Sequence, residues 1–226
     1  MESKTFYRRN LPHYHPEEAI FFVTFNLANS LPRDVVAVLD EERQRELERI
    51  EKDTPPTQRK QKQYEAQKRA FGRYDAWLDR CKDGPHWLAE EPIARIVADQ
   101  IHALDGERYR LLVYCIMSNH VHLLIDASGY LPAYAANHQG KTAVYPLADT
   151  IRLLKGRTAR FCDQALGRSG AFWHHESYDH VVRDEGELLR IMWYILNNPV
   201  KAGLVARWQD WPFTWCHEEL VSPEDE

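Results

Sequence analysis

The chain has 226 residues, of which 44% are hydrophobic and 12% aromatic, and this is enough apolar material for a sizeable core. Its 29 basic and 34 acidic residues give a formal net charge of −5. No global positive field therefore draws it to nucleic acid, and any such binding must come from local basic patches. We expect one domain.

The four cysteines, Cys81, Cys115, Cys162 and Cys216, are far apart and form no Cys-x-x-Cys pair. The N-terminal residues MESKTFYRRNLP contain no apolar signal core. We therefore expect a cytoplasmic protein with reduced thiols. No apolar run approaches the roughly 18–20 residues of a membrane span, so we expect no membrane partner.

The first third of the chain predicts one strand followed by two helices. Residues 19–27, AIFFVTFNL, are rich in β-branched and aromatic side chains and end before the turn residues 29–32. Residues 34–50 carry apolar side chains followed by a charged run, as a helix leaving the core would. Paired prolines in residues 53–57 end that helix, and a second one runs over about 58–80.

The second of these helices is basic in its first part and apolar in its last part. Its basic side chains form either a solvated face or a phosphate-tracking surface: Arg59, Lys60, Lys62, Lys68, Arg69 and Arg73. Its apolar side chains recur at spacings of three and four, and we expect them to contact the core: Phe71, Tyr74, Trp77 and Leu78.

The middle of the chain predicts a helix and then a β-hairpin. Residues 91–104 have apolar side chains at helical spacing. Residues 108–117 and 120–126 are two apolar runs joined by a Ser-Asn pair, which tolerates a tight turn. We expect the strand at residues 19–27 to pair with this hairpin.

The last part of the chain alternates helix and strand. Residues 128–144 lack periodicity and predict a long loop. Residues 146–166 and 185–198 have helical spacing, with Pro199 ending the second helix, and residues 178–182 predict a strand. Strands at the beginning, middle and end, with helices between them, favour an α+β sandwich with an antiparallel sheet. An aromatic tail is expected to pack back on the domain: Trp208, Trp211, Phe213 and Trp215.

Two histidines, His120 and His122, stand at the start of the second hairpin strand. Successive strand side chains face opposite sides, so residues two apart share one face, about 7 Å from each other. That spacing suits two ligands of one metal ion, although a His-x-His pair on a strand can also be structural. His180, on the later strand, is expected to make a hydrogen bond rather than to bind metal.

Tyr194 and Asn198 lie four residues apart in the last predicted helix and therefore share a face. Two imidazoles and an amide oxygen leave positions open for phosphate oxygens and water, and they would accept Mg²⁺ or Mn²⁺. A phenol that has lost its proton can attack phosphorus and form a phosphotyrosine. The alternative is that Tyr194 is a core or interface phenol and Asn198 only a helix end.

Three segments carry a resemblance to a known family. MSNHVHLLI at residues 117–125, SYDHVVRDEGEL at 177–188 and YILNNPVKAGLV at 194–205 together resemble the REP-associated tyrosine transposases, which are single-tyrosine members of the HUH nucleases. The opening FFVTFNLANSLP and the closing DWPFTW are similar as well, so the resemblance covers nearly the whole chain in order.

The resemblance implies a ferredoxin-like or RRM-like antiparallel sheet with helices packed on it. It implies a single HUH domain over residues 1–226, in which the helical stretch at about 33–85 is an enlarged insert. Two positions depart from the family. Ser118 stands where proline is usual and His174 where glutamine is common, and neither change removes a catalytic role.

For function, the resemblance implies metal-dependent cleavage and rejoining of single-stranded DNA near REP-like hairpins. Tyr194 is the expected nucleophile, which takes the 5′ phosphate and leaves a free 3′ hydroxyl. His120, His122 and Asn198 are the expected ligands of Mg²⁺ or Mn²⁺. Because another 3′ end can attack the stored ester, strand transfer requires no external energy source.

Arg152, Lys155 and Arg157 form a basic cluster on the helix at 146–166, and this cluster is either a contact for the DNA backbone or a solvated helix face. We expect a monomer or a homodimer. The alternative function is a domesticated hairpin-DNA-binding protein without turnover. A third is a metal-dependent hydrolase of small phosphoesters, in which Tyr194 is structural.

Overall fold

The computed structural model describes residues 6–8, 12–14, 19–130 and 146–221. The chain forms two compact units, one made of Met1–Ala28 with His86–Glu226 and the other of Asn29–Pro85.

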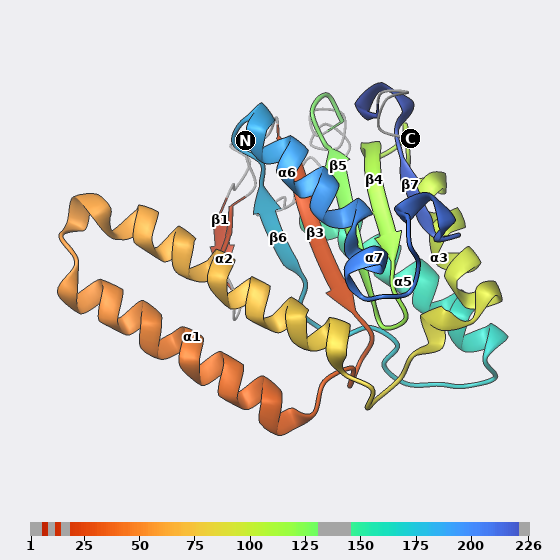
Figure 1. Ribbon diagram of the computed structural model, residues 1–226, viewed down its shortest axis with the longest axis horizontal. Helices are drawn as coiled ribbons and strands as arrows, with labels where there is room; N and C mark the ends of the chain where they lie inside the picture. The colour runs from red at the N-terminus through yellow and green to blue at the C-terminus, as the bar shows by residue number, and fades with distance from the viewer. Residues whose placement is uncertain (1–5, 9–11, 15–18, 131–145, 222–226) are drawn as a thin grey trace, which may run out of the picture. The chain divides into compact units, whose positions relative to one another are not determined.

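The larger unit is built on a five-stranded sheet in the order β6-β3-β5-β4-β7, in which every neighbouring pair is antiparallel (Figure 1). The sheet confirms the predicted α+β class and the pairing of the first strand with the hairpin. Its strands are β3 (Ile20–Asn26), β4 (Arg110–Ile116), β5 (His120–Asp126), β6 (Tyr178–Val181) and β7 (Thr214–Cys216). A separate pair joins β1 (Phe6–Arg8) to β2 (Pro12–Tyr14).

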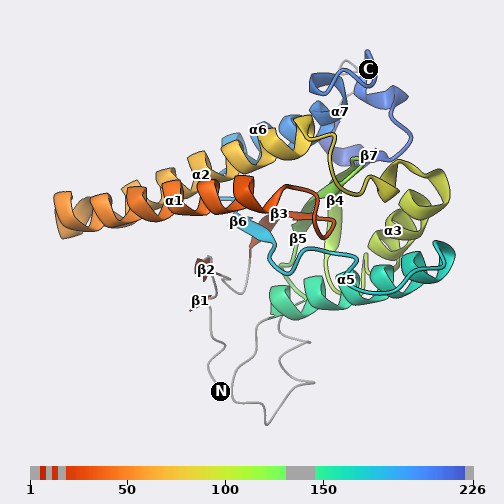
Figure 2. The same cartoon turned by 90° about the horizontal axis from the view of Figure 1, so that it is seen from below.

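Helices cover both faces of this sheet. Figure 2 shows α3 and α5 on one face and α6 and α7 on the other. The helices are α3 (Glu91–Ala103), α5 (Pro146–Ala165), α6 (Glu185–Leu196) and α7 (Asn198–Lys201). Three single turns of 3₁₀ helix are η1 (Trp87–Ala89), η2 (Trp208–Asp210) and η3 (Glu218–Leu220).

Alternation along β5 separates the main core from the histidines. Val121, Leu123 and Ile125 belong to the large hydrophobic cluster that includes the apolar faces of α3 and α5. His120 and His122 occupy the alternate positions and so face α6 and α7. The strand therefore has one apolar face and one face that can carry chemistry.

The helix predicted over residues 185–198 is interrupted in the structure. Helix α6 begins after Asp184, whose side chain accepts a hydrogen bond from the Glu187 amide, and it ends at Leu196. A short helix, α7, then starts at Asn198 with Pro199 in its first turn. The prediction that Pro199 ends the helix was wrong, because proline is well tolerated in the first turn of a new helix.

The aromatic tail packs on the domain as predicted. Phe213 and Trp215 contact the main core, and the Trp211 indole donates a hydrogen bond to the Ile116 carbonyl at 2.9 Å. The tail also supplies β7, which pairs with β4 and was not predicted.

The smaller unit is a hairpin of two helices, α1 (Arg33–Asp53) and α2 (Pro56–Arg80). The proline pair separates them as predicted, and Leu78 packs with Leu31 in a small apolar cluster. Trp77, which was expected to contact the core, is 45% exposed. Three of the predicted basic residues on α2 form ion pairs with glutamates of α1: Arg59 with Glu51, Arg69 with Glu46, and Arg73 with Glu42 and Glu46.

The structure also bears on the predictions for the cysteines, for membrane-spanning helices and for the loop at 128–144. The four cysteines are free thiols, as predicted. No helix in the described part of the chain is long and apolar enough to cross a membrane. Most of the predicted loop at 128–144 lies outside the described residues.

Candidate metal and nucleophile site

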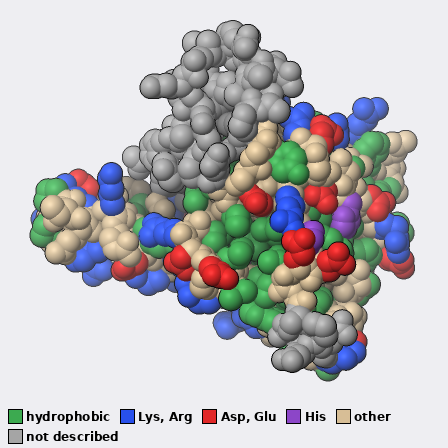
Figure 3. Space-filling view, turned by 90° about the horizontal axis from the view of Figure 1, so that it is seen from above, with side chains coloured by type: hydrophobic (Ala, Val, Ile, Leu, Met, Phe, Trp, Pro, Cys, Tyr) green, Lys and Arg blue, Asp and Glu red, His purple; other side chains and the backbone are tan. Residues whose placement is uncertain are grey.

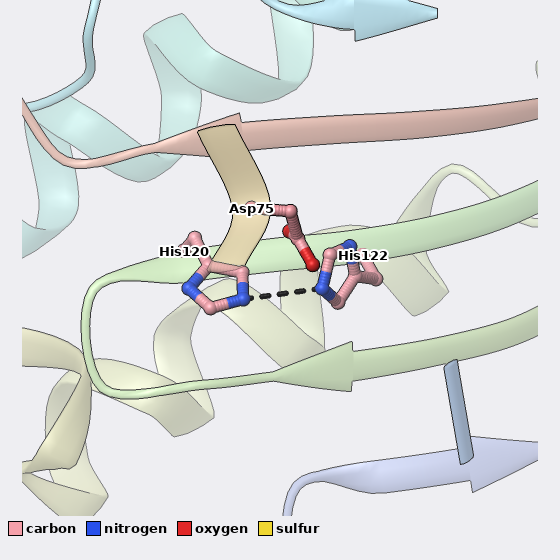
Figure 4. Close-up of side chains that lie close together, drawn as sticks. All are labelled: Asp75, His120 and His122. Atoms are coloured by element: carbon pink, nitrogen blue, oxygen red, sulfur yellow. Dashed lines mark hydrogen bonds between the residues drawn. The ribbon is translucent and has the colours of Figure 1, made fainter. Parts of the chain in front are cut away.

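The two histidines of β5 point at each other. Figure 4 shows the rings of His120 and His122 on the same strand, with their Nε2 atoms 3.1 Å apart. Both side chains are fully buried. Asp75, which is labelled in the same view, is a residue of α2 and belongs to the smaller unit. The predicted shared face of His120 and His122 is therefore confirmed.

Neighbouring side chains orient both imidazoles. Nδ1 of His120 lies 2.6 Å from Oδ1 of Asn119, and Nδ1 of His122 lies 2.8 Å from Oγ1 of Thr24. An amide oxygen can only accept, so the His120 contact places the proton on Nδ1. In the tautomer with a proton on each Nδ1, the lone pairs of both Nε2 atoms point at the same spot. This is the arrangement by which histidines bind a metal.

The Asn198 side chain, on the first residue of α7, lies next to the two histidines of β5. Asn198 is fully buried, and its Nδ2 lies 3.0 Å from Nε2 of His122. Its buried Oδ1 has no hydrogen-bond partner in the described part of the protein. Because the oxygen and nitrogen of a side-chain amide exchange places on a flip, the Asn198 oxygen can also face His122.

Tyr194 lies beside these residues on the last turn of α6. Its ring centroid is 5.5 Å from that of His122 and 6.0 Å from that of Phe22 on β3. The Nζ atom of Lys201 lies 5.7 Å from the centroid of the same phenol ring. The structure thus brings together the four residues predicted as nucleophile and metal ligands: His120, His122, Tyr194 and Asn198.

The donor set fits a divalent metal ion. Two nitrogens 3.1 Å apart are close enough for one ion at about 2.1 Å from each, the usual metal–imidazole distance. Without a cation or a shared proton between them, two such lone pairs repel each other. His120 and His122 belong to a buried group of side chains that could hold a metal ion. The unpartnered amide oxygen of Asn198 adds a hard ligand.

His180 is anchored away from this group, as predicted. Its Nε2 lies 3.2 Å from Oε1 of Glu187, and both side chains are buried. Glu187 also accepts a hydrogen bond from the Arg183 amide. These contacts fix the first turn of α6, the helix that carries Tyr194, against β6.

The predicted DNA-contacting residues lie on α5, which covers the other face of the sheet (Figure 2). Arg152 is exposed and pairs with Asp149, and Arg157 is exposed. The Lys155 ammonium donates to the carbonyls of His174 and His175 at 2.7 and 3.2 Å. The structure does not bring these three residues to the histidines, and the DNA contact stays a prediction.

Sequence reasoning missed the residues that support the site. Thr24 lies directly opposite His122 in the β3–β5 register, so a register assignment for the predicted strand pair could have found it. Asn119 was seen only as a turn residue. Lys201 has no local signal, because its contact with the Tyr194 ring depends on the break between α6 and α7.

Comparison with known proteins gives two similarities. The chain is 28% identical over 120 residues to a protein of Haemophilus influenzae whose name assigns it to the REP-associated tyrosine transposases. The match covers 52% of this chain and 66% of the relative, just under two thirds of its length. No described protein family's sequence profile matches the chain.

The second similarity is to a solved structure of a REP-associated tyrosine transposase bound to a REP hairpin. The TM-score is 0.50 at 17% identity, and the match covers 92% of this chain and 80% of the other. At this identity the likeness supports the fold. The resemblance to REP-associated tyrosine transposases and the α+β antiparallel fold are thereby confirmed.

Proposed function

We propose that the protein is a metal-dependent endonuclease and strand transferase of transposase type that acts on single-stranded DNA near hairpins through a 5′-phosphotyrosine at Tyr194. The observation that carries this proposal is the meeting of Tyr194, Asn198, His120 and His122 in one place. A tyrosine beside a buried His-His-Asn group has the parts that phosphodiester cleavage needs, namely a nucleophile and the ligands of a Lewis acid.

In the proposed reaction, Tyr194 cleaves a phosphodiester and keeps one of the two ends as a covalent ester. The Tyr194 phenol loses its proton to solvent, and its oxygen attacks the phosphorus of the scissile phosphodiester. The bond from phosphorus to the 3′ oxygen breaks, and that oxygen leaves with the electron pair and takes up a proton. The 5′ phosphate stays on Tyr194. A 3′ hydroxyl of another strand reverses these steps and joins the two ends.

His120, His122 and Asn198 would hold a divalent ion, Mg²⁺ or Mn²⁺, which would supply Lewis acidity for the phosphate oxygens. The residues of the chain do the positioning. Asn119 holds His120 in the tautomer that offers Nε2. The Thr24 hydroxyl, 2.8 Å from Nδ1 of His122, can accept from that nitrogen in the matching tautomer of His122. Burial of the histidines excludes bulk water, which strengthens every electrostatic interaction at this spot.

The proposed partner is single-stranded DNA with a REP-like hairpin. The similar solved structure is of a protein bound to a REP hairpin. Because Arg152 and Arg157 lie on the face of the sheet opposite Tyr194, we propose that they contact the hairpin rather than the strand being cut.

The test is covalent trapping. Hairpin-bearing single strands are incubated with the protein and Mn²⁺ or Mg²⁺, and an SDS-resistant protein–DNA adduct is expected. Tyr194→Phe should abolish the adduct. The matched control is Tyr178→Phe, because Tyr178 also packs against Phe22 and lies on β6 beside the site. An adduct that persists in Tyr194→Phe would overturn the assignment of the nucleophile.

The same experiment distinguishes the proposed enzyme from the alternative, a DNA-binding protein without turnover. A hairpin-binding protein without turnover would retain salt-sensitive DNA binding in the absence of any adduct, and it would retain that binding after loss of His120 and His122. Cleavage of a small phosphoester by Tyr194→Phe would instead favour a hydrolase.

A further inference from the structure

One stretch of the sequence around the site has an unusual charge pattern. Residues 188–209 contain no aspartate or glutamate, although the chain carries 34 acidic residues in total. The same stretch contains three cations, Arg190, Lys201 and Arg207. It forms most of α6, all of α7 and the turn that follows. The stretch has no carboxylate of its own to compete with a phosphate for these cations, and the acidic residues of α6 are confined to its first turn and N-cap. This pattern favours the binding of a polyanion.

The side chains of this stretch divide into buried and exposed sets. Met192, Ile195, Leu196 and Asn198 face the sheet and are buried. Arg190, Asn197 and Lys201 are exposed and Trp193 is half-buried, at spacings of three and four that bring these four residues to one side. Arg190 has no carboxylate partner among the described residues, whereas Arg207 pairs with Asp210.

Two exposed leucines lie in the same stretch, Leu189 on α6 and Leu204 just after α7. Only five large hydrophobic side chains are strongly exposed in the described part of the chain, and Leu189 at 42% and Leu204 at 49% are two of them. Cations interleaved with aromatic and aliphatic side chains are typical of surfaces that hold phosphates and unpaired bases together.

This surface is continuous with the nucleophile. The Lys201 ammonium, on the exposed side of α7, lies 5.7 Å from the centre of the Tyr194 ring. A phosphate attacked by Tyr194 would therefore lie within reach of Lys201. On the face seen in Figure 3, apolar side chains gather in the middle and acidic and basic side chains lie around them.

We propose that the exposed side of α6 and α7 is the track for the single strand that is cut. In this arrangement Lys201 binds the scissile phosphate, Arg190 binds a phosphate farther along the strand, and Trp193 stacks on an unpaired base between them. The proposal rests on the proposed function and adds the residues that hold its substrate. It assigns the strand to the face opposite α5, and so separates strand binding from the predicted hairpin contacts.

The test measures binding without chemistry. All variants are made in the Tyr194→Phe protein without divalent metal, and the probe is a fluorescent single strand without a hairpin. Lys201→Ala and Arg190→Ala should each weaken binding about fivefold at 0.1 M salt and reduce the slope of log K against log salt by about 0.7. Trp193→Ala should weaken binding roughly five- to hundredfold with little change in slope.

Matched controls exclude general effects of charge and of tryptophan loss. Arg95→Ala removes one exposed arginine from α3 on the other face of the sheet, and Trp77→Ala removes an exposed tryptophan from α2. Both should bind like the parent. Thermal unfolding of each variant shows whether it is folded, and Lys201→Arg should restore the affinity and slope that Lys201→Ala loses.

The outcomes distinguish this proposal from the proposed function. If the Tyr194→Phe protein binds neither the single strand nor a hairpin-bearing one, the proposed function fails and the track fails with it. If it binds, but Lys201→Ala and Arg190→Ala match Arg95→Ala in affinity and slope, the track alone is wrong.

Discussion

The side-chain amide of Asn198 lies 3.0 Å from Nε2 of His122, although the two residues are 76 positions apart in the sequence. The contact joins the first residue of α7 to the centre of the sheet. Helix α6 ends at Leu196, only two residues before Asn198, so the same contact also fixes the last turn of α6, which carries Tyr194. The proposed third metal ligand, Asn198, and the proposed nucleophile, Tyr194, therefore both depend on one helix junction.

Substitutions of Asn198 test whether its amide is a metal ligand. Asn198→Ala should lower the affinity for Mn²⁺ about tenfold, which corresponds to about 1.4 kcal/mol. Asn198→Asp should raise the affinity, because a carboxylate is a stronger ligand for a hard cation than an amide. Isothermal titration calorimetry measures both affinities.

Asn197 provides the control for Asn198. It is the neighbouring residue, but its side chain is exposed and donates to the Trp193 carbonyl. Asn197→Ala and Asn197→Asp remove the same group and add the same charge, yet they should leave Mn²⁺ affinity unchanged. Equal effects at both positions would mean that Asn198 acts only through local charge or helix structure.

Thr24 should be required for metal binding although it binds no metal. Thr24→Val keeps the shape of the side chain but removes the hydroxyl that lies within hydrogen-bond distance, 2.8 Å, of His122 Nδ1. Loss of such a supporting hydrogen bond typically lowers metal affinity about 10- to 100-fold. It also leaves a buried donor unpaired, at a cost of about 1–3 kcal/mol in the free energy of unfolding.

A second buried threonine separates the two effects of Thr24→Val. Thr158 on α5 accepts from the Trp173 indole at 2.8 Å, so Thr158→Val should also lower the free energy of unfolding. It should not change Mn²⁺ affinity. Thr24→Ser should keep both properties near those of the parent. Unchanged metal binding in Thr24→Val would show that Thr24 does not orient His122.

The hairpin and its histidines could be predicted because local pattern determines them. Alternation places His120 and His122 on one face, and the Ser-Asn turn sets the hairpin register. Tyr194 and Asn198 were correctly paired from a spacing of four. The helix break between them was missed, because a proline near a helix end gives the same local signal whether it ends one helix or starts another.

Features that depend on distant parts of the chain were beyond local reasoning. The three residues of β7 become a strand only by pairing with β4. Periodicity shows that α5 has a buried side, but it does not show which face of the sheet that side covers. The basic cluster on α5 could therefore not be placed relative to Tyr194 from the sequence.

His174 should make stability depend on pH. Burial, with the nearby Lys155 ammonium, lowers the pKa of His174 below its ordinary value. Between the lowered pKa and the ordinary one, about 6.5, the unfolded chain binds a proton that the folded chain does not. The stability contribution is therefore fully present above about pH 6.5 and is lost as the pH falls toward the lowered pKa.

Urea unfolding between about pH 5 and 7.5 measures this dependence. The parent should lose more free energy of unfolding on acidification than His174→Gln, which cannot bind the proton. His175→Gln is the control, since the His175 side chain is 73% exposed, and its profile should follow the parent. Parallel profiles for the parent and His174→Gln would contradict the prediction.

The buried pair of His180 and Glu187 should anchor the helix that carries Tyr194. Glu187→Ala leaves both His180 and the Arg183 amide without this acceptor. Leaving a buried donor without its acceptor typically costs about 1–3 kcal/mol in the free energy of unfolding. Glu187→Gln keeps an acceptor oxygen for the amide and should cost less.

Glu185→Ala is the matched control, because Glu185 lies in the same first turn but is exposed. Its loss removes only a favourable interaction with the helix dipole, worth about 0.3–1 kcal/mol. Hydrogen exchange should report the local consequence, with faster exchange of the α6 amides in Glu187→Ala than in Glu185→Ala. Equal stability and equal α6 exchange in the two variants would show that the pair does not hold the helix, and that other contacts of α6 position Tyr194.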